Sequence, residues 1–172
     1  MTGDGLKAGL LLLFAALVQV SITSNIHVAS GHPDILLVLV IAIGLLRGPT
    51  FGAAAGFWGG LVLDIASFQT LGLTSLLLTL AGYFAGRLGE VTKKSSAHPS
   101  LIAVTVGTIG VALGSAVLHF MLGSTMPAGE FFVEMLLPTL ALNLLLAYPL
   151  YGLCRRLFPV SARERREAVP VV

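Results

Sequence analysis

The lysines and arginines of this chain occur only at alternate gaps between its apolar stretches. Along its 172 residues, the chain passes through apolar segments in pairs and returns to basic residues after each pair. Cytoplasmic loops of membrane proteins keep an excess of Lys and Arg. The placement predicts three helical hairpins with both chain ends in the cytoplasm, which puts all ten basic residues on that side: Lys7, Arg47, Arg87, Lys93, Lys94, Arg155, Arg156, Arg163, Arg165 and Arg166.

The composition agrees with a membrane-spanning chain. It is 56% hydrophobic and only 10% charged, whereas a soluble domain carries about a quarter charged residues. Six spans of about 20 residues would use roughly 120 residues and leave short loops. We therefore expect an all-α integral membrane protein with one transmembrane domain over residues 1–172. The net charge of +2 follows from this topology, so it predicts no nucleic-acid partner.

Hydropathy and turn signals place the six spans. The stretch Leu6–Ile22 is expected to be a retained helix, because its apolar run is long for a signal peptide and five more spans follow. The second span rises only about 21 Å, short of a hydrocarbon core of about 30 Å. It should thin the bilayer, pack inside the bundle or be partly re-entrant. The predicted spans are residues 6–23, 34–47, 50–66, 73–88, 101–122 and 130–158, followed by a short basic tail, 159–172.

Two carboxylates are expected at the membrane boundary opposite the basic residues. Asp34 follows Pro33 at the start of the second span, where it suits the positive end of the helix dipole and could cap the helix. Asp64 ends the third span, where the dipole disfavours an anion. Carboxylates within spans usually face a partner or a water-filled cavity. We expect polar contacts by both side chains at this outer boundary, with hydration by headgroup water as the alternative.

The third span carries a ladder of glycines four residues apart. Gly52, Gly56 and Gly60 would share one helix face and let another backbone approach closely, which is how membrane helices commonly pack. The ladder could pack a neighbouring helix of the same chain or a helix of a partner. Gly82 and Gly86, and likewise Gly110 and Gly114, repeat this spacing, which favours internal packing for most of them.

The remaining polar residues predict anchoring and packing more than chemistry. Arg47 and Arg87 end predicted spans on the basic side and should act as cytoplasmic anchors. Asn143, five residues after Pro138, is expected to hydrogen-bond a neighbouring helix or a freed carbonyl. The sequence contains no phosphate loop, nucleophile elbow or metal-ligand spacing. We therefore expect no enzyme activity, no cofactor and no metal.

The first two hairpins resemble the bacterial rod shape-determining membrane protein family MreD. The resemblance covers about Pro33–Arg87, a third of the chain, and its remainder agrees in length, in span layout and in the short basic tail. It is carried by Pro33-Asp34, by Leu45-Leu46-Arg47-Gly48-Pro49, by Gly60-Leu61-Val62-Leu63-Asp64, by Leu71-Gly72-Leu73 and by Gly82-Tyr83-Phe84-Ala85-Gly86-Arg87.

Membership of this family implies a function without catalysis. The protein would be a multi-pass scaffold of the cell-elongation machinery in the bacterial cytoplasmic (inner) membrane. Its implied partner is the bitopic protein MreC, and beyond MreC lie the MreB filament and the synthase pair of RodA with a class B penicillin-binding protein. The glycine face of the third span and the adjoining surface of the second span, with Asp34 and Asp64 at the outer end, would then dock the partner's transmembrane helix.

The resemblance also supplies the main alternative. The family fold is related to the substrate-binding subunits of energy-coupling-factor transporters, so the chain could instead be a small-ligand (vitamin-type) binding subunit. Such a subunit needs an outer pocket lined by aromatic and polar groups. The only tryptophan is Trp58, and Tyr148 and Tyr151 fall near the cytoplasmic end. The sequence therefore favours the scaffold over the ligand-binding subunit.

Overall fold

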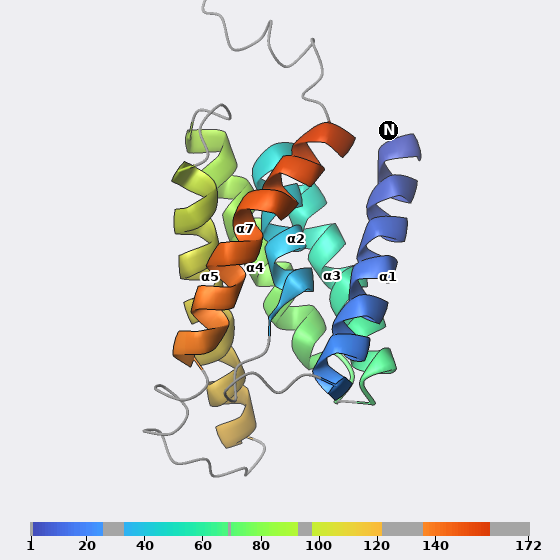
Figure 1. Ribbon diagram of the computed structural model, residues 1–172, viewed down its shortest axis with the longest axis vertical. Helices are drawn as coiled ribbons and strands as arrows, with labels where there is room; N and C mark the ends of the chain where they lie inside the picture. The colour runs from blue at the N-terminus through green and yellow to red at the C-terminus, as the bar shows by residue number, and fades with distance from the viewer. Residues whose placement is uncertain (1, 26–32, 69, 93–97, 122–135, 159–172) are drawn as a thin grey trace, which may run out of the picture.

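The computed structural model describes residues 2–25, 33–68, 70–92, 98–121 and 136–158, and these residues contain six helices (Figure 1). The helices fall where the six spans were predicted. The predicted start of the last span, at residue 130, and the basic tail, 159–172, lie outside the described residues. The helices are α1 (Thr2–Asn25), α2 (Ile35–Arg47), α3 (Pro49–Ala66), α4 (Leu73–Val91), α5 (His98–Met121) and α7 (Leu137–Leu157).

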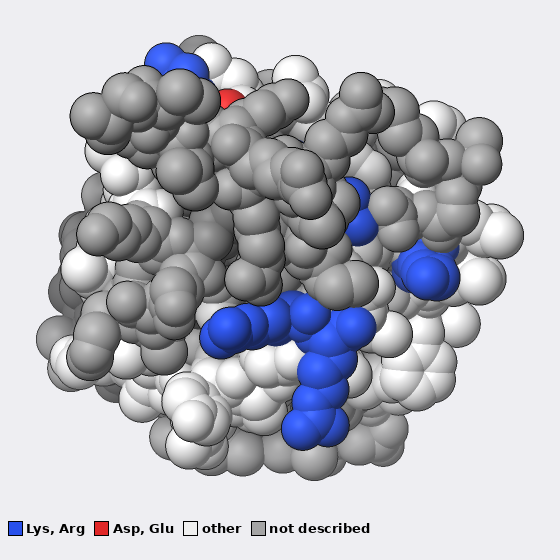
Figure 2. Space-filling view, turned by 90° about the horizontal axis from the view of Figure 1, so that it is seen from above, with Lys and Arg blue, Asp and Glu red and all other residues white. Residues whose placement is uncertain are grey.

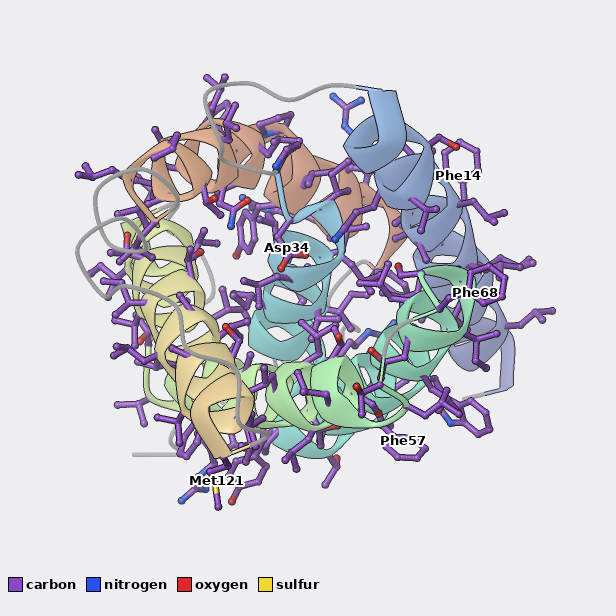
Figure 3. The ribbon with its side chains drawn as sticks, turned by 90° about the horizontal axis from the view of Figure 1, so that it is seen from below. Phe14, Asp34, Phe57, Phe68 and Met121 are labelled. Atoms are coloured by element: carbon purple, nitrogen blue, oxygen red, sulfur yellow. The ribbon has the colours of Figure 1, made fainter. Side chains whose placement is uncertain are left out.

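Helix α2 is the core of the bundle. Every residue from Leu36 to Leu46 is buried, and Figure 3 shows α2 enclosed by the other helices. Its sequence is apolar around its whole circumference, which suits a helix with no exposed face. Of the three possibilities for this short span, the structure has the second: α2 is packed inside the bundle.

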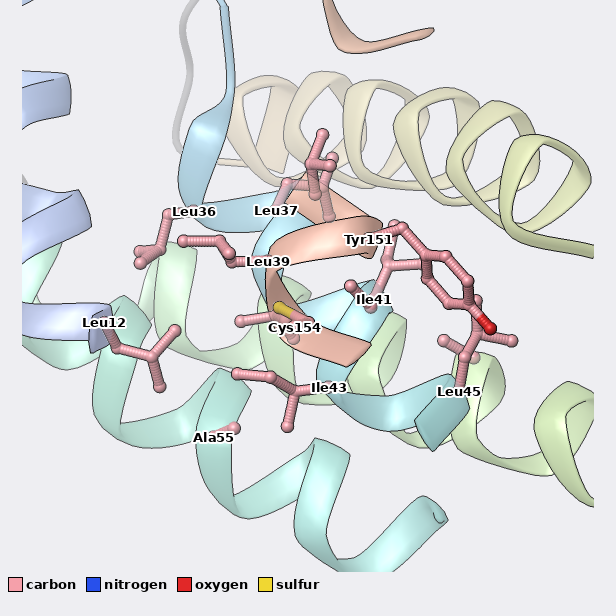
Figure 4. Packing of buried hydrophobic residues seen from close by; sticks show 14 of the residues in the cluster. Leu12, Leu36, Leu37, Leu39, Ile41, Ile43, Leu45, Ala55, Tyr151 and Cys154 are labelled. Atoms are coloured by element: carbon pink, nitrogen blue, oxygen red, sulfur yellow. The ribbon is translucent and has the colours of Figure 1, made fainter. Parts of the chain in front are cut away.

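The side chains around α2 come from helices far apart in the sequence. Leu12 of α1, Ala55 of α3 and Cys154 of α7 are buried in the same hydrophobic cluster as Leu39 and Ile43 of α2 (Figure 4). The lone cysteine is thus an apolar filling group with no exposed surface.

The outer helices expose a large apolar surface. Phe14 of α1, Trp58 of α3, Phe84 of α4 and Leu145 of α7 are each more than half exposed. Many large apolar side chains exposed around a bundle are typical of a protein that contacts lipid or partners. Among the described residues, two helices are long and apolar enough to cross a membrane, at Leu101–Leu118 and Leu137–Leu157. The apolar helical segments Gly5–Ser21 and Ile35–Arg47 are shorter.

The glycine ladder of α3 packs against α4 of the same chain. These two helices have the most extensive contact in the bundle. A β-carbon at any of the three ladder positions would overlap the α4 backbone, so only glycine allows this approach. Gly52 faces the Gly82 carbonyl, Gly56 the Leu78 carbonyl and Gly60 the Ser75 Cα.

The spacing of the ladder left two roles open, packing within the chain and docking of a partner's helix. In the structure the ladder packs within the chain. Helix α4 covers the face on which a partner's helix was expected to dock. A second helix could lie on Gly52, Gly56 and Gly60 only if α4 moved away. We do not assign the partner to this face.

The described lysines and arginines gather at one end of the bundle. Helices α2, α4 and α7 end there and α1 begins there (Figure 1), and Figure 2 shows the basic side chains on this face. We call it the basic end; it carries Lys7, Arg47, Arg87, Arg155 and Arg156. The opposite end, which we call the carboxylate end, carries Asp34 and Asp64.

Candidate functional site

The carboxylate end is organised around Asp34, the residue that precedes the core helix α2. Asp34 is the N-cap of α2, and one of its carboxylate oxygens, Oδ1, accepts a hydrogen bond from the Leu37 N–H at 3.1 Å. A carboxylate at this position satisfies a free backbone donor and lies at the positive end of the helix dipole. The capping role predicted for Asp34 is confirmed, and Figure 3 shows its place inside the ring of helices.

Gln19 ties α1 to this cap. Its side-chain Nε2 donates to Asp34 Oδ1 at 3.1 Å, and its Oε1 accepts from the Leu36 N–H at 2.8 Å. The amide thus uses both its donor and its acceptor on the first turn of α2. Such pairing removes the cost of placing a polar side chain among apolar helices.

Asn143 joins α7 to the same turn. Its Oδ1 accepts from the Asp34 N–H at 2.8 Å, and its Nδ2 donates to Thr108 Oγ1 of α5 at 3.1 Å. Asn143 has no exposed surface, and Thr108 is also buried. The prediction that Asn143 bonds a neighbouring helix is confirmed. Four helices, α1, α2, α5 and α7, therefore meet through the side chains of Gln19, Asp34, Thr108 and Asn143, which we call the polar network.

A cavity of about 190 Å³ opens beside the polar network. All four network residues line it, and Ser115 of α5 and Thr139 of α7 add two more hydroxyl groups. The remaining lining is Pro33, Leu37, Val111, Ala112 and Leu136. A concave site with a few convergent polar groups in an apolar wall is the usual form of a binding site, so this cavity is the candidate functional site.

Asp64 lies elsewhere at this end and serves a different helix. Its Oδ2 accepts from the Gly72 N–H at 2.8 Å and from the Ser75 N–H at 3.4 Å. Gly72 is the N-cap of α4 and has no side chain to cap it. The Asp64 carboxylate supplies the missing acceptor from the end of α3, at the favourable end of the α4 dipole.

The surroundings of Asp64 are closed. The residue is 1% exposed, and its other oxygen, Oδ1, is buried without a hydrogen-bond partner. Ser75, beside it, donates its hydroxyl to the Phe57 carbonyl at 2.9 Å. Asp64 therefore acts within the α3–α4 hairpin, and it does not line the cavity beside Asp34.

The two predicted anchors lie at the basic end. The Arg47 guanidinium lies over the Phe158 ring, with 5.6 Å from Cζ to the ring centroid. Arg87 forms an exposed ion pair with Glu90 at 3.1 Å. Stacking of an arginine on an aromatic ring and a surface ion pair both position a helix end without any catalytic function.

The arrangement supports binding more than chemistry. Among the described side chains, no group of three potential ligands could hold a metal ion. Sequence reasoning missed Gln19, Thr108 and Thr139, which are single polar residues in apolar helices without any local motif. Their wide separation along the chain hid the fact that they line one cavity.

The described residues thus form an α-helical bundle with two helices long and apolar enough to cross a membrane and a polar-lined cavity at one end. The family model described as rod shape-determining protein MreD matches residues 4–160. The chain therefore belongs to the MreD family, which confirms the resemblance noted in its first two hairpins.

One curated relative supports this assignment. The cell shape-determining protein MreD of Streptococcus pneumoniae (strain ATCC BAA-255 / R6) is 37% identical over 87 residues. The match covers 50% of this chain and 52% of the relative, so the chain spans about half the length of the curated relative it matches. No solved structure matches the chain significantly.

Proposed function

We propose that this protein is a non-enzymatic membrane scaffold of the cell-elongation machinery. It would bind an MreC-like bitopic membrane protein and so link rod shape to lateral peptidoglycan synthesis. MreB and the pair of RodA with a class B penicillin-binding protein would be reached through that partner. The family supports a role in rod shape, and the hydrogen-bonded cavity at the carboxylate end supports a binding role.

The proposed orientation follows from the basic end. With that end in the cytoplasm, the six helices cross the bacterial cytoplasmic membrane as three hairpins, N-in and C-in. The carboxylate end then faces outward, where a bitopic partner leaves the membrane. The apolar perimeter of the bundle supports this arrangement.

The cavity is the proposed contact for the partner, and this is the single observation on which the proposal depends. Its polar groups belong to four different helices and already hold one another in place. A partner segment that enters beside Ser115 and Thr139 would contact side chains that are already held in place. Binding would therefore lose little conformational entropy in ordering the cavity wall. We expect a short polar segment of the partner, next to its membrane helix, to bind here.

A ligand-binding subunit related to energy-coupling-factor transporters is the second candidate. An outward-facing cavity with polar lining is the observation that favours it. Against it, the described lining contains no aromatic side chain, and about 190 Å³ is below the roughly 300–1,000 Å³ of typical small-molecule pockets. We therefore favour the scaffold.

The test is to fill the cavity from its wall and measure capture of the partner. Ala112→Leu adds a branched side chain at a lining position without removing any polar group. Ala116→Leu, one turn further along α5 and not in the lining, is the matched control. Tagged protein is extracted from the native host, and the proteins recovered with it are identified by mass spectrometry.

We expect MreC-like and wall-synthase proteins to accompany the wild type and the Ala116→Leu variant, and to be reduced several-fold with Ala112→Leu. Equal recovery with both variants, at equal protein level, would show that the cavity is not the contact. Recovery of an ATPase pair with a membrane coupling subunit would instead support the ligand-binding subunit.

A further inference from the structure

A lateral groove of about 270 Å³ separates parts of α4 and α5. It runs along α4 from Leu77 to Leu88 and along α5 from Ala103 to Gly114, and every residue that lines it is apolar. Phe84 on its wall is 61% exposed. The groove is thus an opening in the side of the bundle; Val111 of α5 lines both it and the polar cavity at the carboxylate end, and the other lining residues of the two differ.

The lining of the groove contains a glycine, Gly110, that internal packing does not require. A β-carbon at Gly107 would lie 2.5 Å from Ile41 Cδ1, and one at Gly114 would lie 2.5 Å from Leu77 Cδ2. These two glycines make room for side chains of the same chain. At Gly110, between them, a β-carbon would meet nothing within 4 Å, so the space there is open to a group from outside.

The dimensions of the groove select its occupant. From Leu77 to Leu88 the helix rises about 16 Å, which is about half of a hydrocarbon core of roughly 30 Å, or one leaflet. A helix is about 10 Å in diameter, so it could seat only side chains of one face in so narrow a groove. A single extended acyl chain of one leaflet matches the length of the groove and its wholly apolar lining.

A basic residue continues the groove toward the basic end. Leu80 and Phe84 line the groove, and Arg87, three residues after Phe84, lies on the same side of α4. Its side chain is 63% exposed, and its ion pair with Glu90 is an exposed one, which contributes little and can be shared. Basic side chains at the cytoplasmic boundary attract anionic headgroups.

From these observations we propose that the α4–α5 groove binds one acyl chain of an anionic phospholipid of the cytoplasmic leaflet, with its phosphate at Arg87. The apolar wall and the open space at Gly110 hold the chain, while the guanidinium selects the headgroup. The leaflet assignment rests on the orientation given under the proposed function. The bound lipid would fill the side of the bundle where α4 and α5 leave a gap.

The experiment measures lipid binding by quenching, with purified full-length protein in nanodiscs. A Trp58→Phe, Phe84→Trp variant carries its only tryptophan on the groove wall. Nanodiscs contain phosphatidylcholine with a small fraction of either brominated phosphatidylglycerol or brominated phosphatidylcholine. We expect stronger quenching by the brominated phosphatidylglycerol, because the groove concentrates the anionic lipid.

Gly110→Leu fills the groove and should lower the excess quenching about tenfold, because fewer methylenes of the lipid can be buried. Gly152→Leu is the matched control, since a β-carbon at Gly152 of α7 also meets nothing within 4 Å, and Gly152 is not among the residues that line the α4–α5 groove. Arg87→Gln should remove the preference for phosphatidylglycerol, whereas Arg156→Gln, also exposed at the basic end, should keep it.

The proposal is overturned if brominated phosphatidylglycerol quenches the Gly110→Leu variant as strongly as the protein that keeps Gly110. It is also overturned if Gly152→Leu lowers the quenching as much as Gly110→Leu does. It is also overturned if Gly110→Leu abolishes partner capture while lipid quenching is unchanged, which would make the groove a helix-docking site. Partner capture by Ala112→Leu tests the scaffold function with a different readout, so either proposal can fail without the other.

Discussion

Asp64 of α3 accepts a hydrogen bond from the backbone N–H of Gly72 at 2.8 Å and thereby caps α4. Gly72 has a φ of 92°, in the left-handed region that glycine adopts without strain. The tight turn brings the start of α4 back to the end of α3. The Asp64 carboxylate therefore closes the α3–α4 hairpin at its turn, and the glycine ladder packs the two helices together along their length.

Replacing Asp64 should lower stability before it affects any partner. Asp64→Ala removes an N-cap acceptor, for which about 0.5–2 kcal/mol of unfolding free energy is typical. Asp64→Asn keeps one acceptor oxygen and should lose less. Glu90→Gln, which changes an exposed carboxylate, is the control and should be nearly neutral. Thermal unfolding in detergent should rank the losses of stability as Asp64→Ala largest, Asp64→Asn smaller and Glu90→Gln smallest. A drop in partner capture by an Asp64 variant of unchanged stability would contradict this prediction.

Gly56 and Gly59 offer a matched pair on α3. A β-carbon at Gly56 would overlap the Leu78 carbonyl, whereas one at Gly59 would lie 3.5 Å from Leu36 Cδ1, an ordinary contact. Gly56→Ala should separate α3 from α4 and cost about 1–3 kcal/mol. Gly59→Ala should be neutral or stabilise by up to about 1 kcal/mol through helix propensity.

Membrane protein level and unfolding temperature in detergent report the difference between these two alanine variants. If Gly56→Ala kept its wild-type level and stability but lost the MreC-like partner, the ladder would face a partner after all. The larger change Gly56→Leu should act in the same direction as Gly56→Ala, with a greater loss of protein.

The bond between Asn143 and Thr108 can be measured by a double-mutant cycle. Asn143→Leu and Thr108→Val each remove one side of the 3.1 Å hydrogen bond. Side-chain hydrogen bonds between membrane helices contribute about 0.6 kcal/mol on average, so we expect a coupling energy of that size. Asn143→Leu alone should cost more, because it also frees the Asp34 N–H. Additive effects within error would show that the pair is not coupled.

Hydropathy and charge placement predicted the helices well because each span carries its own signal. The apolar runs, the turn at Gly48-Pro49 and the glycines define the helices locally, and the described helix ends lie within a few residues of the predicted ones, apart from the start of the last span, which falls outside the described residues. The shortness of the second span even limited where α2 could lie. Its apolar character on all sides then agrees with a central position.

The polar cavity could not be predicted in the same way. Asp34 and Asn143 are 109 residues apart, and Asn143 and Thr108 are 35 apart. No spacing rule links such positions, because their meeting depends on how five helices surround α2. Asp64 shows the same limit. The C-terminal end of its own helix α3 disfavours an anion, and the favourable helix end, the start of α4, lies beside it only in the folded hairpin.

The orientation of the bundle can be tested with single cysteines at its two ends. Thr70, beside the start of α4, and Val91, the last residue of α4, are both exposed. The native Cys154 is buried and is replaced by alanine to remove any background. Because the basic end should be cytoplasmic, Thr70→Cys should react with a membrane-impermeant maleimide in spheroplasts, and Val91→Cys should react only after permeabilisation. The reverse pattern would invert the topology, move the polar cavity to the cytoplasm and remove the proposed contact with an outward-facing partner segment.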